Sequence, residues 1–147
     1  MRKIHIQARS SIHSHKDLWK IMTAIEDYPT WCKFCKKMLT KDIKVVEGTV
    51  FHDVTTLLWI PLTIKHVITK VKPHEELHFF LPLPGGGKMW HKFTFKQKGK
   101  YSYMTSEIIF DLGSRLRNAT VGRILEKRWR QLIEEGFPGF DEKKRIQ

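Results

Sequence analysis

Cysteine, long apolar runs and, over one long segment, acidic residues are all scarce in this 147-residue chain. Two cysteines are too few for a disulfide-rich scaffold, so a reducing cytoplasm is the expected compartment. No run approaches the ~20 apolar residues of a membrane-spanning helix. The basic N-terminal start lacks the apolar segment of a secretory signal peptide, so we expect no export.

The apolar content is that of an ordinary globular protein, because 41% of the residues are hydrophobic and 12% are aromatic. This composition is too rich in apolar residues for intrinsic disorder. The length suits a single domain. We expect that domain to span residues 1–140 and residues 141–147 to form a charged, frayed tail.

Basic residues outnumber acidic residues in the sequence. Lys and Arg number 27 against 15 for Asp and Glu, which gives a net charge of +12, and the segment from Leu77 to Ser106 contains no acid. Such a field attracts nucleic acid, an anionic membrane surface or an acidic ligand, although a solvated surface needs no partner. Trp90 alternates onto the same face as neighbouring lysines, which suits single-stranded nucleic acid or a membrane interface.

The hydrophobic pattern predicts a strand, two short helices, six further strands and a long C-terminal helix. A period of two predicts strands at residues 3–8, 43–46, 49–60, 62–71, 76–81, 89–97 and 101–112. Helical spacing predicts helices around residues 18–25, 29–36 and 114–135. Ser14, followed three residues later by Asp17, is a variant of the capping box that starts a helix.

One apolar stripe marks the C-terminal helix. Its members are Leu116, Thr120, Val121, Ile124, Leu125, Leu132 and Ile133, with Trp129 at the edge. Strands in succession followed by a helix predict an α+β fold with an antiparallel sheet. The helix can bury its stripe only against one face of that sheet, and a curved sheet would leave a cavity between the two.

This order of elements resembles the START-like, helix-grip superfamily, which includes polyketide cyclase/dehydrase-type (SRPBCC) proteins and Bet v 1-like plant allergens. The residues that carry the resemblance are Leu18-Trp19, Glu26-Asp27-Tyr28-Pro29-Thr30-Trp31, Glu47-Gly48-Thr49, Val71 with Pro73, and Leu77 with Phe79. The resemblance covers nearly the whole chain. It implies a curved sheet of about seven strands around the C-terminal helix, with a hydrophobic ligand between them. It carries over no catalytic residue, and it does not decide between transporters, receptors and enzymes.

Histidines in the predicted strands are the candidate acid–base groups. His91 alternates with Met89 and Phe93, and His66 alternates with Ile64, so both are expected to face inward. Asp53 shares its phase with Phe51 and can face inward too. These three residues are the catalytic candidates, while hydrogen-bonded core histidines are the plainer interpretation.

The inward faces also define a candidate ligand pocket. Its expected lining comprises His66, His91, Phe93, Met104, Ser106 and Ile108, closed by Leu125 and Trp129. We expect a lipid- or polyketide-like small molecule there. A cyclase/dehydrase-type enzyme is the first alternative, and charge-driven binding of nucleic acid or an anionic membrane is the second, with nucleic acid the less favoured partner.

Two further motifs invite chemistry that the sequence does not support. Cys32-Lys33-Phe34-Cys35 has C-x-x-C spacing, but no βαβ unit frames a redox site and no second cysteine pair completes a zinc site, so structural thiols are favoured. Gly85-Gly86-Gly87-Lys88 lacks the spacing of a phosphate-binding loop and is interpreted as a loop at the cavity mouth. The sequence therefore indicates no metal and no cofactor.

Overall fold

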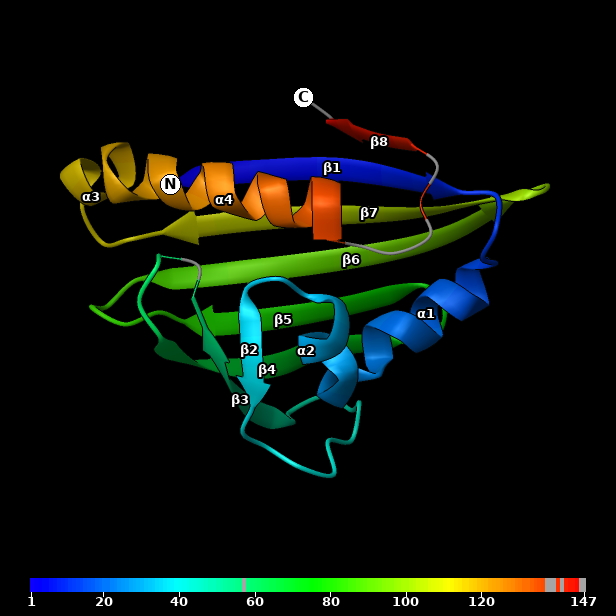
Figure 1. Cartoon of the computed structure of the whole chain (residues 1–147), viewed down its shortest axis with the longest axis horizontal. Coiled ribbons are helices and arrows are strands. Elements are labelled where there is room, and N and C mark those ends of the chain that lie inside the picture. Colours follow the sequence, from blue (N-terminus) through cyan, green and yellow to red (C-terminus); the bar gives the residue numbers. More distant parts are fainter. Residues whose placement is uncertain (57, 137–139, 141, 146–147) are drawn as a thin grey trace.

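A computed structural model describes residues 1–56, 58–136, 140 and 142–145. Within these residues, an antiparallel sheet curves past four helices and a 3-10 turn (Figure 1). The strands are β1 (Arg2–Ser10), β2 (Cys35–Met38), β3 (Val50–Thr55), β4 (Leu62–Lys72), β5 (Glu76–Pro82), β6 (Lys88–Lys98), β7 (Tyr101–Asp111) and β8 (Glu142–Arg145). They are ordered β2-β3-β4-β5-β6-β7-β1-β8, so the first strand of the chain pairs with β7 on one side and with β8 on the other.

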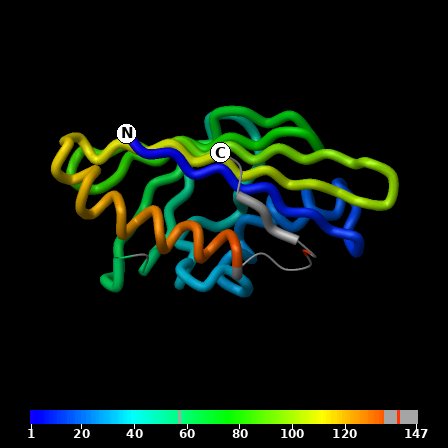
Figure 2. The backbone as a smooth tube through the Cα atoms, turned by 90° about the horizontal axis from the view of Figure 1, so that it is seen from above, coloured from blue at the N-terminus to red at the C-terminus, as the bar shows by residue number. Residues whose placement is uncertain are grey.

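The helices lie on one side of the sheet, as Figure 2 shows from above. They are α1 (His15–Thr23), α2 (Tyr28–Trp31), α3 (Arg115–Ala119) and α4 (Val121–Gly136), with a 3-10 turn, η1 (Ile25–Asp27), before α2. The longest helix, α4, runs along β1 and β7 and does not extend over β3–β5 (Figure 1). The α+β architecture predicted from the sequence is confirmed.

Strict alternation explains why the central strands form as predicted. Along β5 and β7, every second side chain is buried, and the residues between them are partly exposed. A strand directs successive side chains to opposite faces, so alternation in the sequence becomes one apolar and one solvated face. The serine cap is confirmed as well, because Ser14 Oγ accepts a hydrogen bond from the Asp17 backbone N–H at 3.2 Å and α1 begins at the next residue.

The second short helix is shorter than predicted. The sequence predicts helix over residues 29–36, but α2 ends at Trp31 and residues 35–38 form β2. Phe34 and Cys35 are buried here, and the Phe34 carbonyl accepts a hydrogen bond from Thr56 N–H at 3.0 Å. Pairing with β3 satisfies more of this backbone than another helical turn would.

The strand predicted at residues 43–46 does not form. Ile43 instead donates its backbone N–H to Glu26 Oε1 at 2.9 Å, which ties this segment to η1. The chain still forms the six strands predicted between the short helices and the C-terminal helix, because β2 replaces the strand predicted at 43–46. The strand predicted at 49–60 ends at Thr55, since a turn closed by Trp59 N–H and the Thr56 carbonyl follows at once.

The predicted C-terminal helix is broken at Thr120, which separates α3 from α4. Gly122 then approaches the sheet closely: a Cβ at this position would lie 2.9 Å from Arg2 Cδ and 3.5 Å from a Phe110 ring carbon. The missing side chain lets the start of α4 rest on β1 and β7.

The C-terminal segment also differs from the expectation of a frayed tail. Residues 142–145 form β8, which pairs antiparallel with β1 from Ile6 to Arg9 and adds a strand at the sheet edge. Residues 141, 146 and 147 lie outside the described part of the chain.

Candidate functional site

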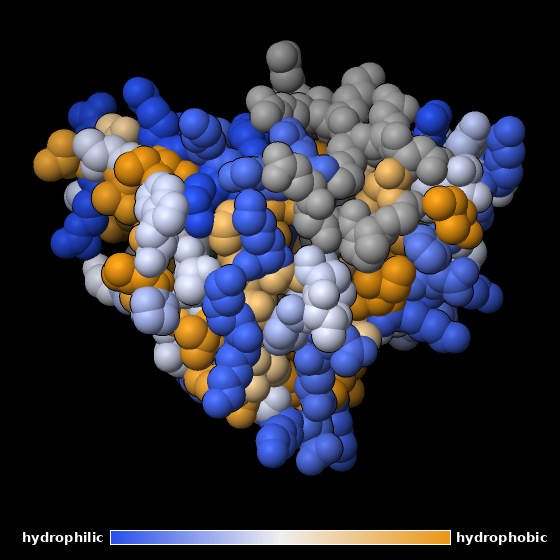
Figure 3. Space-filling model, in the orientation of Figure 1, coloured by the Kyte–Doolittle hydropathy of each residue, from blue (hydrophilic) through white to orange (hydrophobic). Residues whose placement is uncertain are grey.

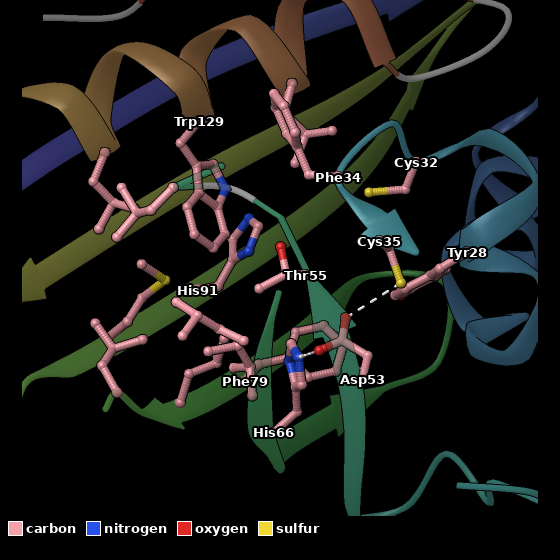
Figure 4. A pocket seen from close by; sticks show the side chains of 18 of the residues that line it. Tyr28, Cys32, Phe34, Cys35, Asp53, Thr55, His66, Phe79, His91 and Trp129 are labelled. Atoms are coloured by element: carbon pink, nitrogen blue, oxygen red, sulfur yellow. Dashed lines mark hydrogen bonds and ion pairs between the residues drawn. The ribbon is translucent and has the colours of Figure 1, made fainter. Parts of the chain in front are cut away.

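A cavity of about 380 Å³ lies between α4 and the inner face of β3–β6. Apolar side chains form most of its wall, as the close view in Figure 4 shows. Six central members of the wall are Phe34, Phe51, Phe79, Met89, Phe93 and Leu125. Few polar groups interrupt this surface, and in sites of this kind such groups orient the bound molecule.

Asp53 is the first polar feature of the cavity. Its side chain is buried on β3, with Oδ1 3.0 Å from His66 Nε2 and Oδ2 accepting a hydrogen bond from Cys35 Sγ at 3.3 Å (Figure 4). The His66 ring stacks on Phe51 with 4.5 Å between ring centroids. These contacts hold the imidazole in one orientation at the cavity wall. They also satisfy both carboxylate oxygens, as a buried acid requires.

His91 is the second polar feature, and its chemistry differs from that of His66. Its Nε2 lies 2.7 Å from Ser106 Oγ, and its ring lies against Phe93 and Trp129. Burial and then the charge of His66 lower the pKa of His91 to about 3. At neutral pH, His91 is therefore an uncharged hydrogen-bonding group.

The two cysteines of the C-x-x-C motif are free thiols at the edge of the cavity. Burial raises the pKa of both, and the nearby Asp53 carboxylate raises that of Cys35 further. Thioredoxin-like chemistry needs a lowered thiol pKa, because the thiolate is the nucleophile. This environment therefore favours the structural interpretation of the thiols.

The structure brings most of the predicted site together. His66, His91, Asp53, Phe93, Leu125 and Trp129 all line the cavity. Met104, Ser106 and Ile108 face the same side of the sheet but lie outside the cavity lining. They belong to β7, which α4 covers directly, and Ser106 reaches the site only through His91.

Sequence reasoning missed several residues of the wall. Phe79 alternates with Leu77 and Leu81, so its inward phase was visible in the sequence. Tyr28 and Phe34 lie in the region around α2, where no regular period marks the inner face. The Tyr28 hydroxyl donates a hydrogen bond to the Met22 carbonyl, which holds its ring against α1.

The β5–β6 loop lies at one end of the cavity, as predicted. Pro84 and Gly85 line the cavity there, and Arg117 Nη1 donates a hydrogen bond to the Gly85 carbonyl at 2.9 Å. Gly85, Arg117 and Val121 are lining residues that are also exposed, so this end is the mouth of the cavity.

Metal sites and membrane spans are both absent from the described residues. In that part of the chain, no group of three or more His, Cys, Asp or Glu side chains is placed to hold a metal ion. Among the helices that the structure describes, none has the length and apolar character needed to cross a bilayer.

Comparison with known proteins places the fold. No family model matches the sequence, and no curated protein matches it either. A solved structure from Thermus thermophilus, TTHA0849, superposes with a TM-score of 0.71 at 10% identity over 90% of each chain. Ara h 8.0201 gives 0.63 at 10% identity over 90% of this chain and 97% of its own.

The di-domain ARO/CYC BexL from the BE-7585A biosynthetic pathway is a third similar structure. It gives a TM-score of 0.62 at 10% identity over 91% of this chain and 47% of its own, so this chain corresponds to about one of its two domains. At this level of identity, the likeness concerns the fold. The chain has the Bet v 1-like helix-grip fold that the sequence resemblance implied.

Proposed function

We propose that this protein binds a hydrophobic or amphipathic small molecule, lipid- or polyketide-like, in the cavity between α4 and the sheet. The cavity itself carries the proposal: about 380 Å³ of space with an almost wholly apolar wall falls within the ~300–1,000 Å³ usual for small-molecule sites. The helix-grip fold supports it, since its similar structures include an ARO/CYC protein. On this proposal, the protein binds its ligand in the cytoplasm.

The wall also suggests the shape of the ligand. Phe51, Phe79 and Phe93 meet edge to face, with neighbouring ring centroids 5.9 and 6.2 Å apart. Aromatic walls of this kind favour planar or ring-bearing ligands. His91 and the Asp53–His66 pair would accept or donate hydrogen bonds to one or two oxygen atoms of such a molecule.

Blocking the cavity tests the proposal. The uncharged fluorescent probe N-phenyl-1-naphthylamine should bind the wild type, and Thr55→Trp should weaken binding at least about tenfold, a loss of roughly 1.4 kcal/mol. Thr55 projects into the middle of the cavity (Figure 4), so the indole would occupy the space of the ligand. Thr63→Trp, on an exposed site of β4, is the matched control and should leave binding unchanged. Equal binding by both variants would refute the proposal.

A second candidate function is acid–base catalysis, and the Asp53–His66 contact favours it. If His66 donates its Nε2 hydrogen to the Asp53 carboxylate, Nδ1 keeps the lone pair of a general base. That nitrogen would take a proton from the carbon next to a ligand carbonyl and return it to a departing hydroxyl, which would leave as water. The reaction consumes no oxidant or reductant.

Deuterium exchange tests this candidate without knowledge of the substrate. In deuterated buffer, the protein should speed the exchange of the acidic C–H hydrogens of 2-tetralone, followed by proton NMR. His66→Gln should remove the acceleration, and Asp53→Asn should reduce it. His78→Gln alters a histidine on the outer sheet face and serves as the control. An acceleration that His66→Gln leaves intact would exclude His66 as the base.

A further inference from the structure

The first half of the C-terminal helical region exposes the apolar stripe that the sequence predicts to be buried. Leu116 is 73% exposed, Val121 is 40% exposed and Ile124 is 45% exposed. The next residue, Leu125, is only 6% exposed and lines the cavity. The first part of the stripe is therefore exposed to solvent, next to the cavity that Val121 and Leu125 line.

A second exposed apolar pair lies on the turn between β3 and β4. Trp59 is 67% exposed and Ile60 is 58% exposed. Trp59 has a φ of 67°, in the left-handed region that a bulky side chain rarely adopts. The Arg128 guanidinium of α4 stacks on its ring at 4.0 Å and on Phe34 at 4.5 Å. This stacking ties an exposed tryptophan to the helix that covers the cavity.

These two segments lie beside the mouth of the cavity. Leu58, which immediately precedes Trp59, lines the cavity, as do Val121 and Arg117. Arg128, which stacks on Trp59, follows Ile124 by about one turn of α4, so the two segments adjoin there. The apolar wall thus continues outward into an apolar rim, defined as Trp59, Ile60, Leu116, Val121 and Ile124. A ligand that leaves the cavity at this end would pass directly onto the rim.

Basic residues accompany the rim. Residues 112–125 contain three arginines and no acid, and Lys127 follows one helical turn after Ile124. In Figure 3, blue and orange side chains lie next to one another over α3 and the start of α4. Basic side chains interspersed with aliphatic ones and a tryptophan are typical of surfaces that lie in the headgroup region of anionic membranes.

We propose that the apolar rim docks on an anionic phospholipid bilayer, so that the ligand passes between cavity and membrane without crossing water. This inference rests on the proposed ligand-binding function. Charge complementarity favours a bilayer over a second copy of the chain, whose rim would bring the same arginines. The aliphatic side chains Leu116, Val121 and Ile124 favour it over nucleic acid, which offers them no apolar contact.

Vesicle flotation tests the docking. Wild type should bind vesicles of phosphatidylcholine with phosphatidylglycerol, bind pure phosphatidylcholine vesicles weakly, and lose affinity as salt increases. Leu116→Glu and Ile124→Glu should each reduce binding at least about tenfold. Ile12→Glu is the matched control, because Ile12 is 71% exposed but lies between β1 and α1, away from the rim.

A matched pair of charge reversals tests the basic part. Arg115→Glu with Arg123→Glu should abolish the preference for anionic vesicles, whereas Lys96→Glu with Lys98→Glu changes the net charge equally on β6 and should retain it. If both pairs reduced binding to anionic vesicles equally, net charge alone would explain the binding, and the proposal that the apolar rim docks on the bilayer would be wrong. The docking proposal would also be wrong if the wild type did not bind anionic vesicles, or if the rim variants lost only the binding of oligonucleotides.

The ligand-binding proposal and the docking proposal can be tested separately. Thr55→Trp should lose the naphthylamine probe and still float with anionic vesicles, whereas Leu116→Glu should keep the probe and lose the vesicles. If wild type floats but never binds the probe, the ligand-binding proposal fails while the docking surface stands. If Leu116→Glu keeps both activities, the docking proposal fails and the cavity stands.

Discussion

Two isoleucines of the same helix lie in opposite environments: Ile133 is 1% exposed in the core, and Ile124 is 45% exposed beside the cavity mouth. Both belong to one amphipathic stripe in the sequence. Gly122 lies close to Arg2 of β1 and Phe110 of β7 at the start of α4. Ile133, near the other end of the helix, lines the cavity, whereas Ile124 does not. A single hydrophobic pattern therefore serves packing at one end of α4 and leaves an apolar surface at the other.

Truncating Ile133 and Ile124 to alanine should give the largest difference in stability between the two ends of α4. Ile133→Ala should lower the free energy of unfolding by about 2–5 kcal/mol, because it removes buried methyl groups and leaves a cavity. Ile124→Ala should change it by less than about 0.5 kcal/mol. Chemical unfolding followed by circular dichroism measures both. Similar losses for the two variants would mean that Ile124 is packed in solution.

The buried end of the cavity should also respond to acid through His91. The folded-state pKa of about 3 lies below the ordinary value of 6.5, so below pH 6.5 the unfolded chain binds a proton that the folded protein does not. The stability contributed by this group is complete above pH 6.5 and falls towards pH 3, by roughly 1.4 kcal/mol per pH unit.

His91→Gln should flatten that part of the stability curve. Unfolding free energies of wild type and variant at pH 7, 6 and 5 would show the difference in slope. His13→Gln is a control in the segment between β1 and α1 and should retain the wild-type slope. If the His91 variant has the slope of the wild type, His91 is not the neutral buried group described above.

A substitution beside the mouth of the cavity should have the smallest effect on the free energy of unfolding. Trp59 is largely exposed and holds a backbone conformation that a glycine adopts more easily, so Trp59→Gly should change the free energy of unfolding by less than about 1 kcal/mol in either direction. Thermal unfolding measures this directly. A large loss would show that the Arg128 stack holds the fold together rather than presenting a surface.

How far the sequence predicted the molecule depends on whether a feature is local. Strands β5, β6 and β7 alternate over most of their length, so period and phase located them and placed His91 on the inner face. The same phase placed Asp53 of β3 and His66 of β4 on that face. β2 was missed because its pairing with β3 overrides a helix-like start at Pro29. Its position depends on contacts across the sheet, which periodicity does not contain.

The lining of the cavity shows the same limit. Phase correctly placed Met104, Ser106 and Ile108 on the inner face, but the position of α4 over β7 decides that they lie outside the cavity. The helix starts directly after the break at Thr120, with Gly122 close to Arg2 and Phe110. Neither Thr120 nor Gly122 interrupts the helical pattern in the sequence, so the sequence alone predicted one continuous helix with one buried stripe.

The central claim is that a hydrophobic molecule binds inside the cavity, and the tryptophan indole signals test it most directly. In two-dimensional ¹H–¹⁵N NMR, N-phenyl-1-naphthylamine should shift the indole signal of Trp129 in the cavity wall and leave that of Trp90 on the outer sheet face unchanged. Trp129→Phe and Trp90→Phe would assign the two signals. A shift of the Trp90 signal with a stationary Trp129 signal would place the binding site on the surface and contradict the claim.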